Sequence, residues 1–115
     1  MKCGLEFEVI DETAFFRLIG EFKSNGNERE STLFDFRGKL DGYLLTQQQN
    51  NKPVRVIVDM KKCELINSVN LGTLIVAHSK LTKLGSKLEV INLHGCVLSL
   101  FLSSRMQYMM DCSVL

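Results

Sequence analysis

Apolar and polar residues alternate at the start of the chain in a way that predicts two strands. Residues 5–9 read Leu-Glu-Phe-Glu-Val, which is the two-residue period of a strand with one face in water. Residues 14–19 are aromatic and β-branched and end at Gly20, so they predict a second strand. The polar residues 11–13 between them form a turn, and we expect the pair to be a hairpin.

Two further segments have the composition of buried strands. Residues 54–59 are dense in valine and isoleucine and follow Pro53, which is acceptable at the start of a strand but not in its middle. We expect this strand to lie at the centre of a sheet of at least four strands and to need cover on both faces. Residues 88–93, Leu-Glu-Val-Ile-Asn-Leu, predict another strand.

Three segments have the period of helices, about 3.6 residues. The clearest begins within two residues of Ser68, ends before Gly85, and is expected to bury Leu71 and Leu74. We expect a second helix over residues 31–49, with Leu33, Phe36, Leu40 and Leu44 on one face, and a last helix over residues 97–110, with a possible break at Ser103 and Ser104. Residues 23–32 are expected to form a polar loop, and residues 60–66 a short linker.

Two glycines interrupt the helix expected over residues 31–49. Gly38 and Gly42 are four residues apart, so they lie on one face of that helix. We expect the missing side chains to permit close approach of the helix to a sheet.

The element order is therefore ββαβαβα, which predicts an α/β fold with a mixed sheet covered by helices in a single domain over residues 1–115. The net charge is only +1, which gives no electrostatic reason to expect nucleic acid as a partner. No apolar run approaches the roughly 20 residues needed to cross a bilayer, so we expect no membrane insertion and a cytoplasmic location.

The turn between the central strand and its helix resembles a known motif. It reads Asn67-Ser68-Val69-Asn70-Leu71-Gly72, and it is similar to the Asp-Ser-Ser-Gly-Leu-Gly turn of STAS domains, the fold of anti-sigma factor antagonists. Ser68, Leu71 and Gly72 match the motif, whereas Asn67, Val69 and Asn70 depart from it. The resemblance covers about residues 5–110 and implies a STAS-like fold.

The resemblance also implies a role for Ser68, because the matching serine of the family is phosphorylated by a partner kinase. A phosphate there would face the free N–H groups and the positive end of the helix dipole. The alternative is that Ser68, or Asn67, only caps the helix. We expect the partner-binding surface to comprise Asn67, Ser68, Val69 and Asn70, with Lys61 and Lys62 available to pair with a phosphate or with a partner's carboxylate.

Little in the sequence points to catalysis or to a cofactor. There is no glycine-rich phosphate loop and no carboxylate pair on a recognisable element. His94 and Cys96 are close in sequence but lack further metal ligands, and His78 has no nucleophile at a telling spacing. We therefore expect no cofactor and no enzyme activity.

Three functions stay open. The first is a regulatory module that binds an anti-sigma factor or a related serine kinase or phosphatase and is switched by phosphorylation of Ser68. The second is a constitutive scaffold or accessory subunit that uses the same surface without phosphorylation, which Asn67 and Val69 favour. The third is a sensor of a small ligand or nucleotide, which the fold permits.

Overall fold

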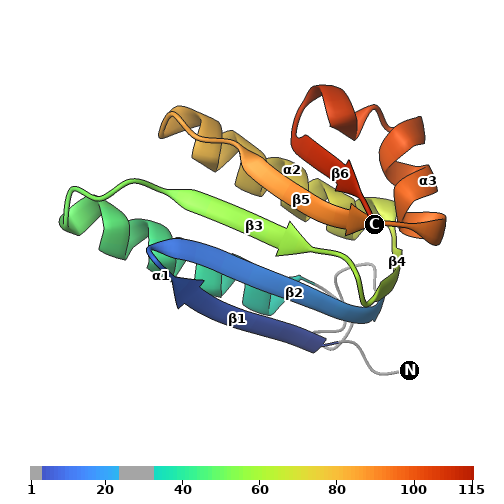
Figure 1. Cartoon of the computed structure of the whole chain (residues 1–115), viewed down its shortest axis with the longest axis horizontal. Coiled ribbons are helices and arrows are strands. Elements are labelled where there is room, and N and C mark those ends of the chain that lie inside the picture. Colours follow the sequence, from blue (N-terminus) through green and yellow to red (C-terminus); the bar gives the residue numbers. More distant parts are fainter. Residues whose placement is uncertain (1–3, 24–32) are drawn as a thin grey trace.

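Within the residues that the structure describes, the chain folds into one mixed sheet with three α-helices on one side of it (Figure 1). The structure is a computed structural model that describes residues 4–23 and 33–115. The loop predicted over residues 23–32 therefore lies outside the described residues, apart from Lys23. In chain order the elements are β1 (Gly4–Ile10), β2 (Thr13–Phe22), α1 (Phe34–Gln49), β3 (Arg55–Asp59), β4 (Cys63–Ile66), α2 (Ser68–Lys83), β5 (Leu88–Leu93), α3 (Gly95–Ser103), the 3-10 helix η2 (Met106–Tyr108) and β6 (Asp111–Val114).

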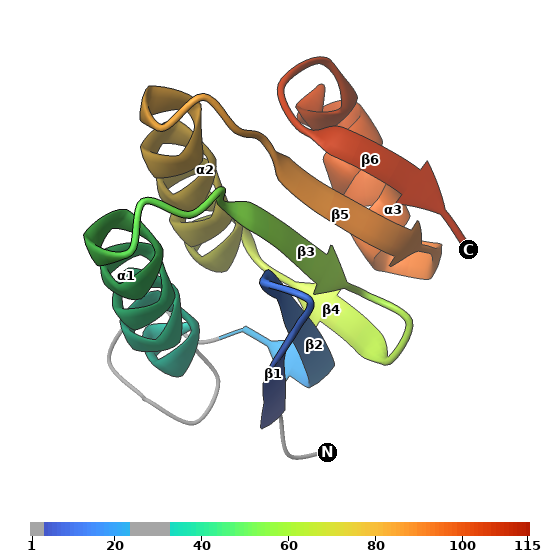
Figure 2. The ribbon, with the colours of Figure 1, turned by 60° about the vertical axis from the view of Figure 1, so that its left-hand side comes forward.

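The sheet has β3 at its centre, as the density of β-branched residues predicts. The strand order is β1-β2-β3-β5-β6, with β1 antiparallel to β2 and the other neighbours parallel (Figure 2). The predicted hairpin is confirmed, and its turn residues Asp11 and Glu12 both have positive φ, which suits the right-handed twist of the two strands. The α/β class and the mixed sheet are thus confirmed.

Two short strands are absent from the predicted order. Residues 60–66 were expected to be a linker, but Cys63–Ile66 form β4, which pairs in parallel with the second half of β2. The last helix was expected to run to residue 110, but α3 ends at Ser103, and Arg105 then adopts a left-handed conformation. The chain turns there and returns as β6 beside β5.

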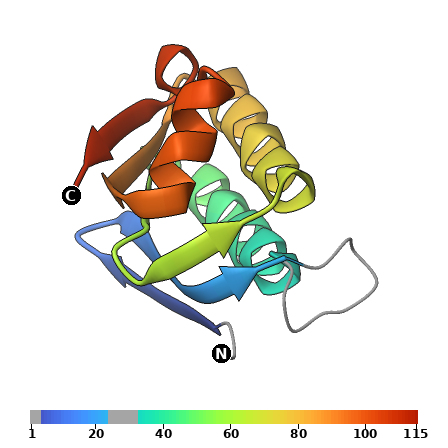
Figure 3. The ribbon, with the colours of Figure 1, turned by 90° about the vertical axis from the view of Figure 1, so that its right-hand side faces the viewer.

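The expectation that helices cover both faces of the central strand is wrong. Figure 3 shows α1, α2 and α3 on the same side of the sheet. Val56 and Val58 point into the core on that side, whereas Arg55 and Asp59 alternate with them on the other. The charged residues at each end of β3 are at least partly exposed, so no helix covers them, although Ile57 between them is buried.

The core between helices and sheet is built from the predicted apolar positions. Leu71 and Leu74 of α2 are 3% and 0% exposed, which confirms the predicted inner face of that helix. Phe36 of α1 meets Phe16 of β2 edge to face with ring centroids 4.7 Å apart. The other residues predicted to face inward, Leu33 just before α1 and Leu40 and Leu44 within it, are buried as well.

The two glycines of α1 do not have the expected role. Gly38 and Gly42 are exposed, and a Cβ atom added at either would meet nothing within 4 Å. They line a hollow beside Phe7 and Val9 of β1 and permit no close approach of helix to sheet. The prediction fails because α1 turns these glycines outward and packs its leucines inward.

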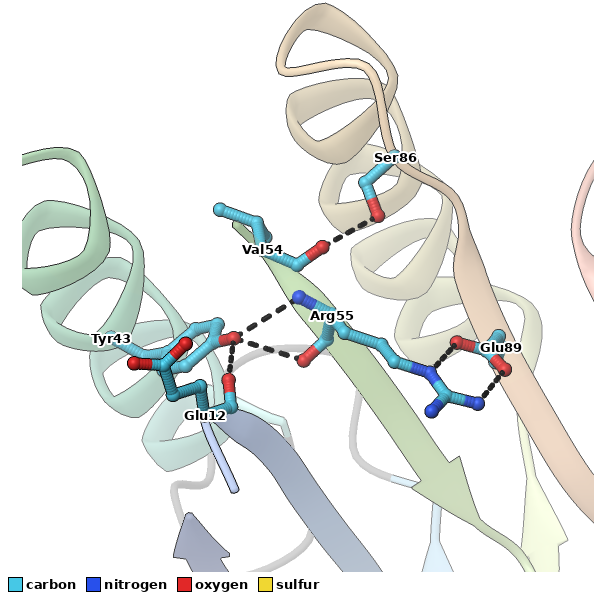
Figure 4. A network of polar contacts seen from close by, with 6 residues as sticks. All are labelled: Glu12, Tyr43, Val54, Arg55, Ser86 and Glu89. Carbon is cyan, nitrogen blue, oxygen red and sulfur yellow. Dashed lines mark hydrogen bonds and ion pairs between the residues drawn. The ribbon is translucent and has the colours of Figure 1, made fainter. Parts of the chain in front are cut away.

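A polar network fixes the end of the sheet that lies away from Ser68 (Figure 4). The Tyr43 hydroxyl of α1 donates to the carbonyl of Glu12 in the β1–β2 turn and accepts from the backbone N–H of Arg55 at 3.0 Å. Arg55 and Glu89 form a bidentate ion pair from β3 to β5, with N–O distances of 2.9 and 3.0 Å. This pairing raises the pKa of the Arg55 guanidinium.

Candidate functional site

The turn that carries Ser68 lies at the predicted start of α2, but the element before it is the unpredicted strand β4. β4 runs beside the last residues of β2, and α2 begins at Ser68 and continues for 16 residues. The backbone N–H of Asn67 donates to the carbonyl of Phe22, the last residue of β2, at 2.9 Å. The start of α2 is therefore held against the end of a strand, and the turn has a fixed place at one end of the sheet (Figure 3).

Asn67, and not Ser68, caps this helix. The Asn67 backbone is extended, and its side-chain Oδ1 accepts the N–H of Asn70 at 2.9 Å. Ser68 is the first helical residue and is exposed. Within residues 4–23 and 33–115 no group hydrogen-bonds its hydroxyl. The hydroxyl is thus accessible to a modifying enzyme, and its modification would not remove the cap.

The electrostatic surroundings of Ser68 favour a negative charge. The first turn of α2 contains no acidic residue. The dipole of a 16-residue helix places partial positive charge at the N-terminus, worth about 0.3–1 kcal/mol to an exposed anion. Because Asn67 is neutral, no fixed charge on the neighbouring side chain opposes a phosphate at Ser68.

An apolar strip continues from Ser68 along the outer face of α2. Val69 is 50% exposed and Val76 is 51% exposed. They are seven residues apart, so they lie on the same side of the helix with partly exposed Thr73 between them. We call Val69, Thr73 and Val76 the valine strip. Val76 was not among the predicted site residues, although an apolar residue off the inner helical face was a signal for it.

Asn70 lies beneath the turn rather than on its surface. Its side chain is 2% exposed, and among the described residues it hydrogen-bonds Leu33, Phe22 and Asn67. Oδ1 accepts the backbone N–H of Leu33 at 3.0 Å, and Nδ2 donates to the Phe22 carbonyl at 3.2 Å and to Asn67 Oδ1 at 2.8 Å. We therefore assign Asn70 to the support of the site, because a partner cannot contact a side chain that is buried in this way.

Lys61 and Lys62 are separated from Ser68 by the whole of β4. Four residues of strand span about 13 Å, at about 3.3 Å per residue, so these lysines lie at the opposite end of β4 from the turn. The expectation that they pair with a phosphate on Ser68 does not fit this geometry; the unpredicted strand is the reason. They line a separate hollow of about 310 Å³ with Arg17 and Asp59, and contact with a partner there stays a proposal.

The ring nitrogens of both histidines lie within hydrogen-bond distance of backbone groups. His78 Nδ1 accepts the backbone N–H of Leu88 at 3.3 Å, and His94 Nε2 lies 2.9 Å from the carbonyl of Lys61. Among the described residues there is no group of three or more His, Cys, Asp and Glu that could hold a metal ion. The helices of this same part of the chain include none long and apolar enough to cross a membrane.

Comparison with known proteins identifies the fold. No protein-family model and no curated protein sequence matches the chain. Several solved structures are similar to it, and two of them match it along most of its length. One is the crystal structure of a candidate anti-sigma factor antagonist from Thermotoga maritima, with a TM-score of 0.67, 10% identity, and coverage of 96% of this chain and 86% of that one.

The second similar structure is the anti-sigma factor antagonist SpoIIAA in its unphosphorylated form. Its TM-score is 0.65 and its identity 16%, over 86% of this chain and 82% of SpoIIAA. At such identities the likeness concerns the fold. The STAS fold implied by the turn motif at Asn67–Gly72 is thereby confirmed.

Proposed function

We propose that this chain is a non-enzymatic regulatory module of the STAS type that binds a protein partner around Ser68, and that phosphorylation of Ser68 switches the binding. The observation that carries the proposal is that two different residues at the start of α2 serve as helix cap and as candidate phosphorylation site. Asn67 caps the helix, which leaves the Ser68 hydroxyl exposed and without a hydrogen-bond partner among the described residues. A serine needed as the cap would be a poor site for a reversible modification.

The proposed binding surface combines this hydroxyl with the valine strip. Valines 69 and 76 supply exposed apolar area next to Ser68, and apolar contact with a polar rim is the usual composition of a protein interface. By analogy with the two similar structures, the partner is an anti-sigma factor or a related serine kinase or phosphatase in the cytoplasm. The unmodified chain binds, and the phosphorylated chain is released.

The release follows from charge. A phosphoserine carries about −1.5 to −2 charges at pH 7 and strongly attracts water. Bringing that charge against an apolar or acidic partner surface costs about 3 kcal/mol, which is about a hundredfold in the dissociation constant. Without a partner, the same charge is tolerated because it lies at the positive end of α2.

Mass spectrometry of the chain incubated with its native partner and ATP tests the modification. We expect a mass increase of one phosphoryl group, located at Ser68 by peptide mapping, and no increase for Ser68→Ala. Ser79 is the internal control because it is exposed on the same helix about 16 Å away, at 1.5 Å of rise per residue. Phosphate at Ser79, or none at all, would contradict the switch.

A second candidate function is a scaffold that binds constitutively through the same surface. The exposed Val69 favours it, because an apolar contact next to Ser68 does not depend on phosphorylation. The neutral Asn67 favours it as well, since a kinase that reads a carboxylate before the serine would not engage this chain. The scaffold predicts equal partner affinity for Ser68→Ala and Ser68→Asp, whereas the switch predicts weaker binding only for the aspartate.

A further inference from the structure

Asn70 is one of the few buried polar side chains in the described residues, together with Gln47 and His78. Its amide uses both of its functional groups. The oxygen accepts from the backbone of Leu33, 37 residues earlier, and the nitrogen donates to the backbone of Phe22, 48 residues earlier. An amide supplies an acceptor and a donor at once, whereas a carboxylate cannot donate and would face the oxygens of Phe22 and Asn67.

These bonds join three elements at one point. Phe22 is the last residue of β2, Leu33 is the residue before α1, and Asn70 lies in the first turn of α2. Figure 3 shows the end of β2 and the starts of α1 and α2 gathered at the same edge of the molecule. The N-cap residue of α1, Leu33, has no side-chain cap of its own, so the bond from its N–H to Asn70 fixes the position of the helix start.

We infer that Asn70 is a positioning residue that couples the charge at position 68 to the position of the start of α1. A negative group at position 68 attracts the N–H groups of the first turn of α2, and one of these is the Asn70 N–H that now donates to Asn67 Oδ1. A shift of Asn70 changes its bond to Leu33. The first turn of α1, with exposed Asp35 and Arg37, then belongs to the same switched surface as Ser68.

This inference rests on the proposed function and deepens it, since it makes the start of α1 part of the surface that the partner contacts. Its test needs no partner. Amide exchange and chemical shifts are measured by NMR on the full chain alone. Ser68→Asp should shift the Leu33 amide and the Asn70 side-chain amide and change the Leu33 exchange rate by about tenfold, the worth of one hydrogen bond. Ser79→Asp, which puts the same charge further along α2, should shift neither amide.

Removing the Asn70 side chain tests directly whether its hydrogen bond to Leu33 transmits the effect. Asn70→Ala should speed exchange of the Leu33 amide about tenfold and abolish its response to Ser68→Asp. Gln47→Ala is the matched control because Gln47 is also buried and also donates from its side chain to a backbone carbonyl, that of Pro53 at 2.7 Å. It removes a comparable bond at the far end of α1, so the response of Leu33 to Ser68→Asp should survive.

The inference would be overturned if Ser68→Asp shifted the Asn70 amide but left the chemical shift and exchange rate of the Leu33 amide unchanged. It would also be overturned if the Leu33 amide still responded to Ser68→Asp in the Asn70→Ala variant. If Asn70→Ala does not fold, the comparison of Ser68→Asp with Ser79→Asp in the otherwise native chain decides alone. Either failure leaves the proposed switch standing, because phosphorylation and partner binding are measured separately.

Discussion

Asn67 Oδ1 accepts two hydrogen bonds from Asn70, one from its backbone N–H at 2.9 Å and one from its side-chain amide at 2.8 Å. The cap of α2 is therefore itself held in place by a buried residue one turn later. Both bonds need only an acceptor at position 67, so an aspartate can make them as well as an asparagine.

The first prediction compares two substitutions of this cap. Asn67→Ala should lower the free energy of unfolding by about 1 kcal/mol, because an N–H of the first turn loses its partner. Asn67→Asp should keep the cap and add about 0.3–1 kcal/mol from the helix dipole. Urea unfolding followed by circular dichroism measures both values. Equal stability of the two variants would show that the side chain of Asn67 does not cap α2.

The second prediction concerns the core. Leu74 is fully buried between α2 and the sheet, so Leu74→Ala should lower the free energy of unfolding by about 2–5 kcal/mol. Val76→Ala on the outer face of the same helix is the control and should change it by less than about 0.5 kcal/mol. The same urea titration gives both numbers. Similar losses for the two variants would mean that the inner and outer faces of α2 are misassigned.

The third prediction concerns the valine strip. Val76→Lys places a charge in the proposed interface and should weaken partner binding by at least about tenfold, which corresponds to about 1.4 kcal/mol. Val9→Lys is matched to it, since Val9 of β1 is 50% exposed and Val76 is 51% exposed, but Val9 lies outside the proposed interface. Isothermal titration calorimetry with the partner should therefore separate the two variants. Binding that is unchanged by Val76→Lys would remove this strip from the interface.

The fourth prediction concerns thiol reactivity. Partial burial, together with the nearby carboxylate of Asp111, raises the pKa of the Cys112 thiol in β6. Cys96 is exposed. Since the thiolate is the reactive form, iodoacetamide at pH 8 should alkylate Cys96 well before Cys112, as peptide mapping would measure. Faster alkylation of Cys112 would show that β6 leaves the sheet.

The same raised pKa fixes the sign of a pH effect. The folded chain holds the Cys112 proton more tightly than the unfolded chain, whose thiol has an ordinary pKa of about 8.5. The contribution of Cys112 to stability is therefore complete below about pH 8.5 and is lost as the pH rises through the folded pKa. Cys112→Ser should flatten the stability profile in this alkaline range.

The sequence predicted the elements whose patterns are long and regular. The strand at Leu88–Leu93 and the start of α2 at Ser68 agree with the structure, because each has a clear period and a clear boundary residue. β4 was missed because four residues are too few to establish alternation. β6 was missed because the methionines before it continue a helical pattern, which the left-handed Arg105 ends.

The candidate site was predictable only in part. Ser68 came from a local motif, which a sequence displays directly. The burial of Asn70 depends on Phe22 and Leu33, which are distant in the sequence and meet it only in the folded chain. The distance of Lys61 from Ser68 likewise depends on β4 being extended. Residues that act through tertiary partners leave no local pattern.

The central claim is that the charge at position 68 controls partner binding. The most direct measurement is isothermal titration calorimetry of the partner with the unmodified chain and with the chain phosphorylated at Ser68. We predict that phosphorylation raises the dissociation constant about a hundredfold, that Ser68→Asp raises it by a smaller factor, and that Ser79→Asp leaves it unchanged. Equal affinity of the phosphorylated and unmodified chains would contradict the switch and favour the constitutive scaffold.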